Sequence, residues 1–182
     1  MALETRPRTI DPTRFREVLG NYATGVTVVT SMNGGMPIGT TVNSFTSVSL
    51  DPAMVLVCIG RERTIHPVLA ATGRFTVNIL REDGQDLSDC FAGAPSELPR
   101  EAFCDAAYRI GDNATPILAS ALAHLDCTVE RTLEAGDHTI YLARVTDLES
   151  HDRAALPLLY FRGRYLRIER AEASELRGKP DA

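Results

Sequence analysis

Hydroxyl and amide side chains gather in one short stretch of the sequence. Residues 39–52 read GTTVNSFTSVSLDP, and seven of these fourteen residues are Thr, Ser or Asn. The stretch lies between two apolar segments, 26–30 and 54–59. Because polar side chains between apolar strands need hydrogen-bond partners, a ligand with many hydrogen-bonding edges would satisfy them. The alternative is a turn-rich edge segment in which Ser and Thr bond to their own backbone.

The common motifs of nucleotide and hydrolase chemistry are absent from the sequence. It contains no G-x-G-x-x-G, no G-x-x-x-x-G-K-[ST], no G-x-S-x-G and no H-E-x-x-H. The four cysteines, at 58, 90, 104 and 127, have irregular spacings and no C-x-x-C pair that could bind zinc. We therefore expect buried or half-buried thiols and no metal site.

Length and charge restrict the class of protein. A chain of 182 residues fits one domain with a single sizeable core. The formal charge of −5, without a run of Lys or Arg, disfavours a nucleic-acid or anionic-membrane partner. With no long apolar segment and no apolar region after the basic N-terminal residues, we expect a soluble, cytoplasmic protein.

The N-terminal half predicts a helix followed by a β-meander. After a flexible arm (residues 1–10), Asp11 and Pro12 supply an N-cap and a first-turn proline, and the next residues repeat an apolar face at helical spacing. That face comprises Phe15, Val18, Leu19 and Tyr22. Strands are predicted at 26–30, 54–59 and 74–80. A hairpin signal at Asn33-Gly34 follows the first strand, and the second is expected to be buried on both faces.

The C-terminal half predicts more antiparallel strands. A short helix at 85–91, with Leu87 and Phe91 facing inward, precedes a loop at 93–105. Residues 123–130 alternate apolar and polar side chains, which is the period of a half-buried strand. A turn at Gly136-Asp137, a strand at 139–145 and a hairpin within 156–168 follow.

These elements predict the architecture. Six to eight strands in hairpin order favour a mainly β, antiparallel barrel over a doubly wound parallel sheet. One domain would span residues 11–170, followed by a flexible tail at 171–182.

Five segments resemble, in order, the short-chain flavin reductases that serve two-component monooxygenases. The segments are GVTVVT at 25–30, TVNSFTSVSLDP at 41–52, FTVNIL at 75–80, GDHT at 136–139 and PLLYFRG at 157–163. The resemblance covers the chain from about Phe15 to Tyr165. It implies an FMN-binding split β-barrel, a homodimer, and hydride transfer from NADH, or NADPH, to FMN or FAD. The reduced flavin would pass to a partner monooxygenase.

The resemblance also implies binding residues and no catalytic nucleophile. The isoalloxazine ring and its side chain would lie against Pro37, Ile38, Gly39, Thr40, Thr41, Asn43 and Ser44, and beside the main chain of Cys58, Ile59 and Gly60. Thr64 and Ile65 would meet the phosphate region, with Cys90 and Phe91 completing that end. The nicotinamide nucleotide would meet His138, Tyr160, Phe161, Arg162 and Gly163.

The chain departs from its relatives after the strand at 54–59. Residues 61–66 read RERTIH where many relatives have a serine. Arg61 or Arg63 could hold a phosphate, and the alternative is that these arginines are only solvated at the surface. His138 has the alternative interpretation of a turn histidine bonded locally, and we predict that His124, on the polar face of its strand, lies at the surface.

Two other functions remain open. A flavin-binding electron carrier on the same barrel would have no reason to keep the Gly136–Thr139 turn and the Tyr160–Gly163 hairpin. A pyridoxal-phosphate-forming oxidase would need a basic cluster for its substrate phosphate, and no such cluster stands out.

Overall fold

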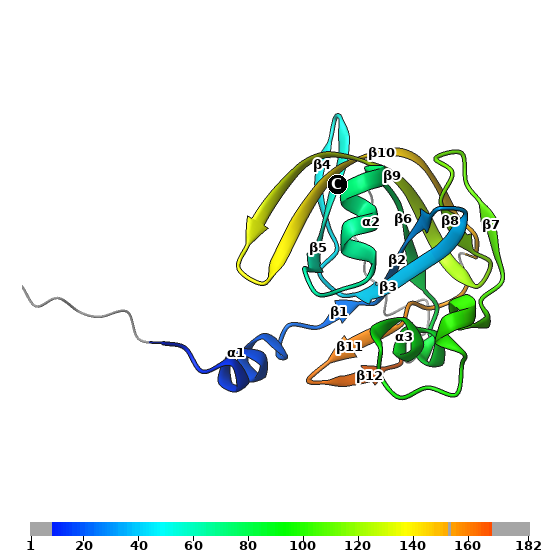
Figure 1. Cartoon of the computed structure of the whole chain (residues 1–182). Helices are drawn as coiled ribbons and strands as arrows, with labels where there is room; N and C mark the ends of the chain where they lie inside the picture. Colours follow the sequence, from blue (N-terminus) through cyan, green and yellow to red (C-terminus); the bar gives the residue numbers. More distant parts are fainter. Residues whose placement is uncertain (1–8, 153, 169–182) are drawn as a thin grey trace, which may run out of the picture.

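Strands form most of the regular structure. The computed structural model describes residues 9–152 and 154–168 (Figure 1). The helices are α1 (Pro12–Leu19), α2 (Ile65–Thr72), α3 (Gln85–Ala92) and the short 3-10 helix η1 (Arg100–Asp105). The strands are β1 (Thr24–Gly25), β2 (Thr27–Asn33), β3 (Met36–Val42), β4 (Thr46–Leu50), β5 (Ala53–Gly60), β6 (Arg74–Leu80), β7 (Tyr108–Ile110), β8 (Pro116–Leu118), β9 (Ala121–Ala135), β10 (His138–Ser150), β11 (Leu159–Phe161) and β12 (Arg164–Leu166).

Seven strands form the main sheet in the order β3-β2-β6-β9-β10-β5-β4. All of its pairs are antiparallel, which confirms the predicted fold class and excludes a doubly wound parallel sheet. The edge strands β3 and β4 are not paired with each other, so the sheet is curved but not closed by hydrogen bonds. A small sheet of β1, β11 and β12 and the β7–β8 hairpin complete the β-structure.

The predicted hairpins form where the sequence places glycine in the turn. Gly34 and Gly35 connect β2 to β3 with φ of 57° and 89°, and Gly136 begins the β9–β10 turn with φ of 64°. Two-residue turns with positive φ match the twist of the flanking strands, and glycine adopts them without a steric penalty.

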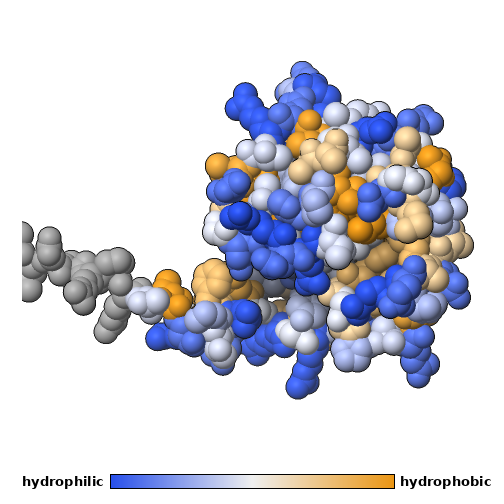
Figure 2. Space-filling model, in the orientation of Figure 1, coloured by the Kyte–Doolittle hydropathy of each residue, from blue (hydrophilic) through white to orange (hydrophobic). Residues whose placement is uncertain are grey.

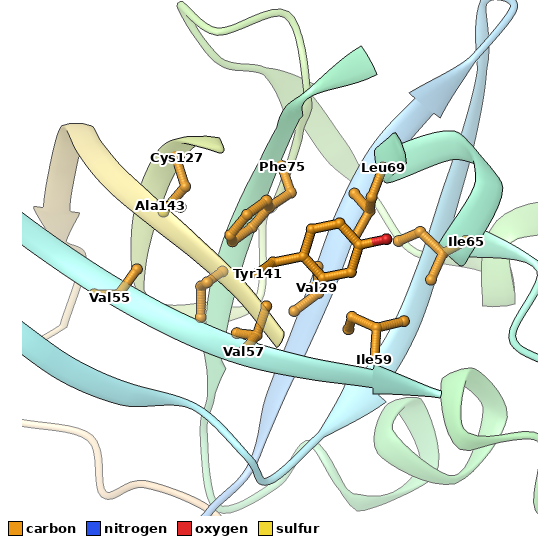
Figure 3. Close-up of a cluster of buried hydrophobic side chains, with 11 residues drawn as sticks. Val29, Val55, Val57, Ile59, Ile65, Leu69, Phe75, Cys127, Tyr141 and Ala143 are labelled. Carbon is orange, nitrogen blue, oxygen red and sulfur yellow. The ribbon is translucent and has the colours of Figure 1, made fainter. Parts of the chain in front are cut away.

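The main core lies between the sheet and α2 (Figure 3). Tyr141 is at its centre, 1% exposed, and its hydroxyl donates to the carbonyl of His66 at 3.3 Å. In β5, Val55, Val57 and Ile59 are buried and the intervening side chains are half-exposed, so the prediction of a strand buried on both faces was wrong. Only one face of β5 packs against the core.

A second core includes an unexpected disulfide. Cys90 of α3 is bonded to Cys104 of η1, with Phe91 and Phe103 packed edge to face beside it at 5.0 Å between ring centroids. The prediction of four thiols was therefore wrong for two of them, because irregular spacing carries no information on which cysteines meet in space. Of the segment predicted as a loop, residues 100–105 form η1.

The polar face of β9 is covered. His124 and Asp126 are 1% and 0% exposed, so the prediction that His124 lies at the surface was wrong. The β7–β8 hairpin lies over this face, and its strand β8 is tied to the sheet by Leu118 N–H donating to Asn78 Oδ1 at 2.8 Å. Farther along β9, Thr128 and Glu130 are exposed, so the predicted polar face is buried only at His124 and Asp126.

Helix α1 has the predicted apolar face but packs it against nothing in the described chain. Asp11 caps the helix by accepting from the Arg14 N–H at 2.9 Å, as predicted. Phe15, Val18 and Leu19 are 51%, 63% and 55% exposed. Figures 1 and 2 show the segment that carries α1 standing apart from the main body, with hydrophobic residues on its surface.

The described helices have eight residues or fewer, and none is long and apolar enough to cross a membrane. The predicted tail at 171–182 and residues 1–8 of the predicted arm lie outside the described residues.

Candidate nucleotide-binding site

Three cavities with shared walls run along the edge of the sheet near β3. The first, here called the helix cavity, has a volume of about 650 Å³ and lies between α1, the β9–β10 turn and the β11–β12 turn. The central cavity, of about 400 Å³, lies between β3, α3 and the β11–β12 hairpin. The third, here called the α3 cavity, has about 430 Å³ and is bounded by β3, the β5–α2 connection and the α3–η1 segment. Pockets of this size are typical of small-molecule and cofactor sites.

The three cavities bring together most of the predicted binding residues. The helix cavity is lined by Asn43, His138, Tyr160, Phe161, Arg162 and Gly163. The central cavity is lined by Thr41, Asn43, Tyr160 and Gly163, and the α3 cavity by Pro37, Ile38, Gly39, Thr40, Thr64, Cys90 and Phe91. Residues predicted from segments far apart in the sequence therefore do lie along one surface.

Five predicted residues, Ser44, Cys58, Ile59, Gly60 and Ile65, line none of these three cavities. Ile59 and Ile65 are 1% and 0% exposed, and their side chains belong to the main core. Cys58 and Gly60 lie in β5 opposite β10, where Gly60 is paired with His138. The main-chain contacts predicted for Cys58, Ile59 and Gly60 stay a prediction, and Ile65 offers no side chain to a phosphate.

Two hydroxyls of the polar stretch form hydrogen bonds to the backbone of neighbouring elements. Ser44 Oγ donates to the Cys58 carbonyl at 3.0 Å and accepts from the Cys58 N–H at 3.1 Å, which ties the β3–β4 connection to β5. Thr41 Oγ1 donates to the Ser88 carbonyl at 2.7 Å and ties β3 to α3. For Ser44 and Thr41, backbone partners satisfy the hydroxyls in place of a ligand.

Asn43 is different from its hydroxyl-bearing neighbours. Its side chain lines the helix cavity, the central cavity and a further cavity that includes Ser44. Among the described residues, its amide forms no hydrogen bond, and the residue is exposed. A free amide with one acceptor and two donors at the junction of the cavities is the group best placed to bind a polar ligand edge.

Gly39 allows α3 to approach β3 closely. A Cβ at this position would come within 2.8 Å of the Phe91 ring, which is too close for a real contact. Phe91, buried beside the disulfide, therefore forms the floor of the α3 cavity because residue 39 has no side chain.

Two arginines, Arg63 and Arg100, line the α3 cavity together with Glu62 and Glu101. Arg63 donates to the Ala92 carbonyl at 2.7 Å and Arg100 donates to the Ala94 carbonyl at 3.3 Å, so both guanidinium groups lie at the C-terminal end of α3. Neither forms an ion pair within residues 9–152 and 154–168. Arg61, the other candidate, lies 3.9 Å from Glu134. Arg63 is thus the better phosphate ligand of the two predicted arginines, and Arg100 was missed.

The turn that carries His138 is exposed. His138 Nδ1 lies 2.8 Å from Asp137 Oδ1, and the imidazole is about half-exposed at the wall of the helix cavity. The hydrogen bond and the charge of His138 lower the pKa of Asp137. The local bond fixes one ring nitrogen and leaves Nε2 free to meet a ligand.

Sequence reasoning missed the residues that close the cavities from outside β3. Tyr165 lines the central cavity, and its hydroxyl bonds to Ser88 Oγ at 2.9 Å and donates to Asp89 Oδ1 at 2.8 Å. Phe15, Arg16, Leu19 and Tyr22 of the α1 segment line the helix cavity. Their apolar spacing indicated a buried helix face, and no signal indicated a cavity wall.

The row of cavities has the lining of a nucleotide cofactor site: aromatic and main-chain walls, a free amide and unpaired guanidinium groups on an antiparallel sheet. Residues 19–169 match the flavin reductase like domain family, so the chain belongs to this family.

Comparisons with individual proteins agree with this assignment. The chain is 38% identical over 160 residues to the reductase subunit HsaB of a flavin-dependent monooxygenase from Rhodococcus jostii, covering 88% of this chain and 80% of that protein. It is 41% identical to a probable flavin reductase of Rhizobium meliloti, of which it spans 48%. It superposes with a TM-score of 0.79 on the NADH:FAD oxidoreductase SgcE6 of Streptomyces globisporus, solved with NAD and FAD fragments, at 35% identity and 89% and 97% coverage.

Proposed function

We propose that this chain is an NAD(P)H-dependent flavin reductase that transfers a hydride from NADH, or NADPH, to FMN or FAD and supplies the reduced flavin to a monooxygenase. The observation that carries the proposal is the row of three cavities, of which the helix cavity and the central cavity meet at Asn43, in a member of the flavin reductase like domain family. The SgcE6 and HsaB relatives support the nicotinamide substrate and the oxygenase partner.

The residues present fit a flavin nucleotide. Asn43 can meet the polar edge of the isoalloxazine ring from the central cavity, between β3 and Tyr160. The phosphate end fits the α3 cavity, where Arg63, Arg100 and Thr64, at the N-terminus of α2, are grouped. The guanidinium groups and the Thr64 hydroxyl are favourable partners for a phosphate. The first turn of α2, in contrast, offers few N–H groups, because the His66 N–H bonds to the Arg63 carbonyl at 2.9 Å and Pro67 has none.

The helix cavity fits the nicotinamide nucleotide. His138 and Arg162 supply a ring nitrogen and a guanidinium at its wall, and Arg162 is held by two bonds to Asn21 Oδ1 at 2.9 and 2.7 Å. Because Asn43, Tyr160 and Gly163 line both this cavity and the central one, ligands in the two cavities would be adjacent.

The cofactors supply the chemistry when bound, a hydride passing from the nicotinamide ring to the flavin ring. The chain holds the two rings together, orients them and excludes water from the space between them. This role needs no protein nucleophile, so binding residues alone account for catalysis.

A homodimer belongs to the same proposal. The exposed apolar face of α1, which also forms a wall of the helix cavity, needs a cover, and a second copy of the chain would supply it. We place the enzyme in the cytoplasm, as the sequence predicts.

The test is anaerobic NADH oxidation by the purified chain with FMN, FAD or riboflavin, followed by the absorbance of both cofactors, and repeated with NADPH. We expect oxidation only when flavin is present. Flavin binding without NADH turnover would contradict the proposal and favour an electron carrier. His138→Ala should raise the KM for NADH at unchanged flavin affinity, by about one decade if one hydrogen bond to a charged group is lost.

A further inference from the structure

A cluster of histidines and carboxylates lies at the end of the β9–β10 ladder opposite the His138 turn. His124 and Asp126 of β9 are paired with Glu149 and Asp147 of β10, respectively, and His151 follows directly after β10. The cluster shares no residue with the three cavities described above. The proposed reductase activity therefore does not use it.

A β-bulge places these side chains on one face. Val145 is paired with Cys127, but the next pair is Asp147 with Asp126, so Thr146 is the extra residue in β10. Paired residues of an antiparallel ladder point to the same face. If β10 alternated regularly, with Thr146 paired, Asp147 would share the face of Val145. The bulge turns Asp147 and Glu149 to the side of His124 and Asp126, and bulges commonly redirect side chains at functional sites in this way.

Two buried polar atoms in this cluster have no partner. His124 Nε2 and Asp126 Oδ2 form no hydrogen bond within the described part of the chain, although the residues are 1% and 0% exposed. Asp126 Oδ1 accepts from Thr76 Oγ1 at 2.6 Å, which leaves one oxygen of a fully buried carboxylate unsatisfied. Unpartnered buried atoms are costly and rare in folded proteins. A bound group that satisfies both is therefore the economical explanation.

The second histidine orients the first. His124 Nδ1 lies 2.9 Å from His151 Nε2, and His151 Nδ1 lies 3.6 Å from a Glu149 oxygen. If each histidine carries its proton on Nδ1, the His124 Nδ1–H donates to His151 Nε2, and the His151 Nδ1–H points to Glu149. The lone pair of His124 Nε2 then faces Asp126 and Asp147. Histidines that bind metals use their other ring nitrogen in this way.

We propose that His124 Nε2, Asp126 and Asp147 bind a divalent transition-metal ion such as Zn²⁺, which ties β9 to β10 at this end of the sheet. Their three ligand atoms lie within 4.8 Å of one another, and His124 Nε2 is 3.7 Å from Asp147 Oδ2. Ligands about 2.1 Å from a tetrahedral ion are roughly 3.4 Å apart, so closure needs a small movement. Asp147 is half-exposed and free to make it.

The charge of the cluster favours a dication. Asp126, Asp147 and Glu149 contribute three carboxylates, and the only cation paired with them in the described residues is Arg109, 3.3 Å from Glu149. An imidazole ligand disfavours Mg²⁺ and Ca²⁺, which prefer all-oxygen sites.

The test is a titration of the full chain, stripped by a chelator and dialysed, with Zn²⁺ and separately with Mg²⁺. We expect one Zn²⁺ per chain by elemental analysis and calorimetry, a Zn²⁺-dependent rise in Tm, and no rise with Mg²⁺. Asp147→Asn removes an exposed ligand without leaving a buried cavity, and should weaken Zn²⁺ binding at least tenfold. Asp83→Asn, an exposed carboxylate paired with Arg81, is the matched control and should bind Zn²⁺ as the parent chain does.

Two results would overturn the proposal. The first is a stripped chain that binds no Zn²⁺ at micromolar concentration, which would leave the cluster as a hydrogen-bonded histidine pair. The second is Zn²⁺ binding that Asp147→Asn leaves unchanged, which would place the ion elsewhere. His138→Ala, which alters the other exposed histidine site, should retain the Zn²⁺-dependent rise in Tm.

Discussion

Two neighbouring residues of the polar stretch have opposite roles, and substitution separates them. Asn43→Ala should raise the flavin Kd roughly 2- to 13-fold at unchanged Tm, because an exposed amide with no hydrogen-bond partner among the described residues loses only its bond to the ligand, about 0.5–1.5 kcal/mol. Fluorescence titration with FMN and FAD measures the change. An Asn43→Ala chain that binds flavin as well as the parent does would remove Asn43 from the site.

Ser44→Ala should act on stability instead. The substitution removes both bonds between Ser44 Oγ and the main chain of Cys58, at a cost of about 1–3 kcal/mol. A change of that size lowers the Tm of a chain of this length by several degrees. Thermal unfolding without ligand is the measurement, and a weaker flavin Kd at an unchanged Tm would contradict the structural role.

Tyr165 predicts a loss of stability at high pH. Burial raises the pKa of its phenol to about 12 from an ordinary value of 10. Between these values, the unfolded chain has lost the proton and the folded chain keeps it, so stability falls as pH rises from about 10 to 12. Chemical unfolding across this interval should show a shallower decline for Tyr165→Phe. Burial also raises the pKa of Cys127 to about 12. The parent and the Tyr165→Phe variant share the effect of Cys127 on stability, so it does not alter the comparison.

At the scale of elements, the disulfide holds η1 against α3. It closes a loop with a sequence separation of 14, and a loop of about this length contributes roughly 3 kcal/mol through the entropy of the unfolded chain. Reduction should lower the Tm and weaken flavin binding, because Cys90 and Phe103 line the α3 cavity. Differential scanning fluorimetry with and without reductant tests both effects.

The Cys58→Ser chain is the control for this prediction. Cys58 is a free, half-buried thiol, so the Cys58→Ser chain should respond to reductant as the parent chain does. A parent chain with the same Tm in both redox states would show that the disulfide adds nothing to stability.

Local sequence signals predicted the elements well and their partners poorly. The Val-rich segment at 26–30 and the Asn33-Gly34 turn are strand and hairpin signals contained within a few residues, and both are confirmed. The burial of His124 depends on β8, and the Cys90–Cys104 bond depends on how η1 folds back on α3. No fixed spacing in the sequence indicates that β8 will cover His124 or that η1 will fold back on α3.

The same distinction applies to the site. The family resemblance supplied the residues of β3 and the two turns that line the cavities. It did not distinguish Ser44, whose hydroxyl is used by Cys58, from Asn43, whose amide is free. Whether a polar side chain finds a hydrogen-bond partner is decided in the folded chain, because it depends on which backbone groups come within about 3 Å of that side chain.

At the scale of the whole molecule, α1 should join two chains. Its face carries Phe15, Val18 and Leu19 at 51% to 63% exposure, beside the helix cavity. We expect a homodimer by light scattering, and we expect Val18→Glu to shift it toward monomer by placing a charge in the interface. Glu17→Gln, on the same helix, should leave the dimer intact. A parent chain that is monomeric at micromolar concentration and fully active would refute this assembly.

The bulge at Thr146 lets β10 hold an extra residue without exchanging its two faces. In a regular strand the side chains alternate, so an extra residue would turn every residue after it to the opposite face until the chain leaves the sheet. Because Thr146 is left unpaired, Asp147 pairs with Asp126 directly after the Val145–Cys127 pair, and the two faces are kept. Deleting Thr146 would therefore leave Asp147 and Glu149 on the side of His124. The pairing that the bulge sets, and not the number of residues in the strand, decides which side chains reach this face.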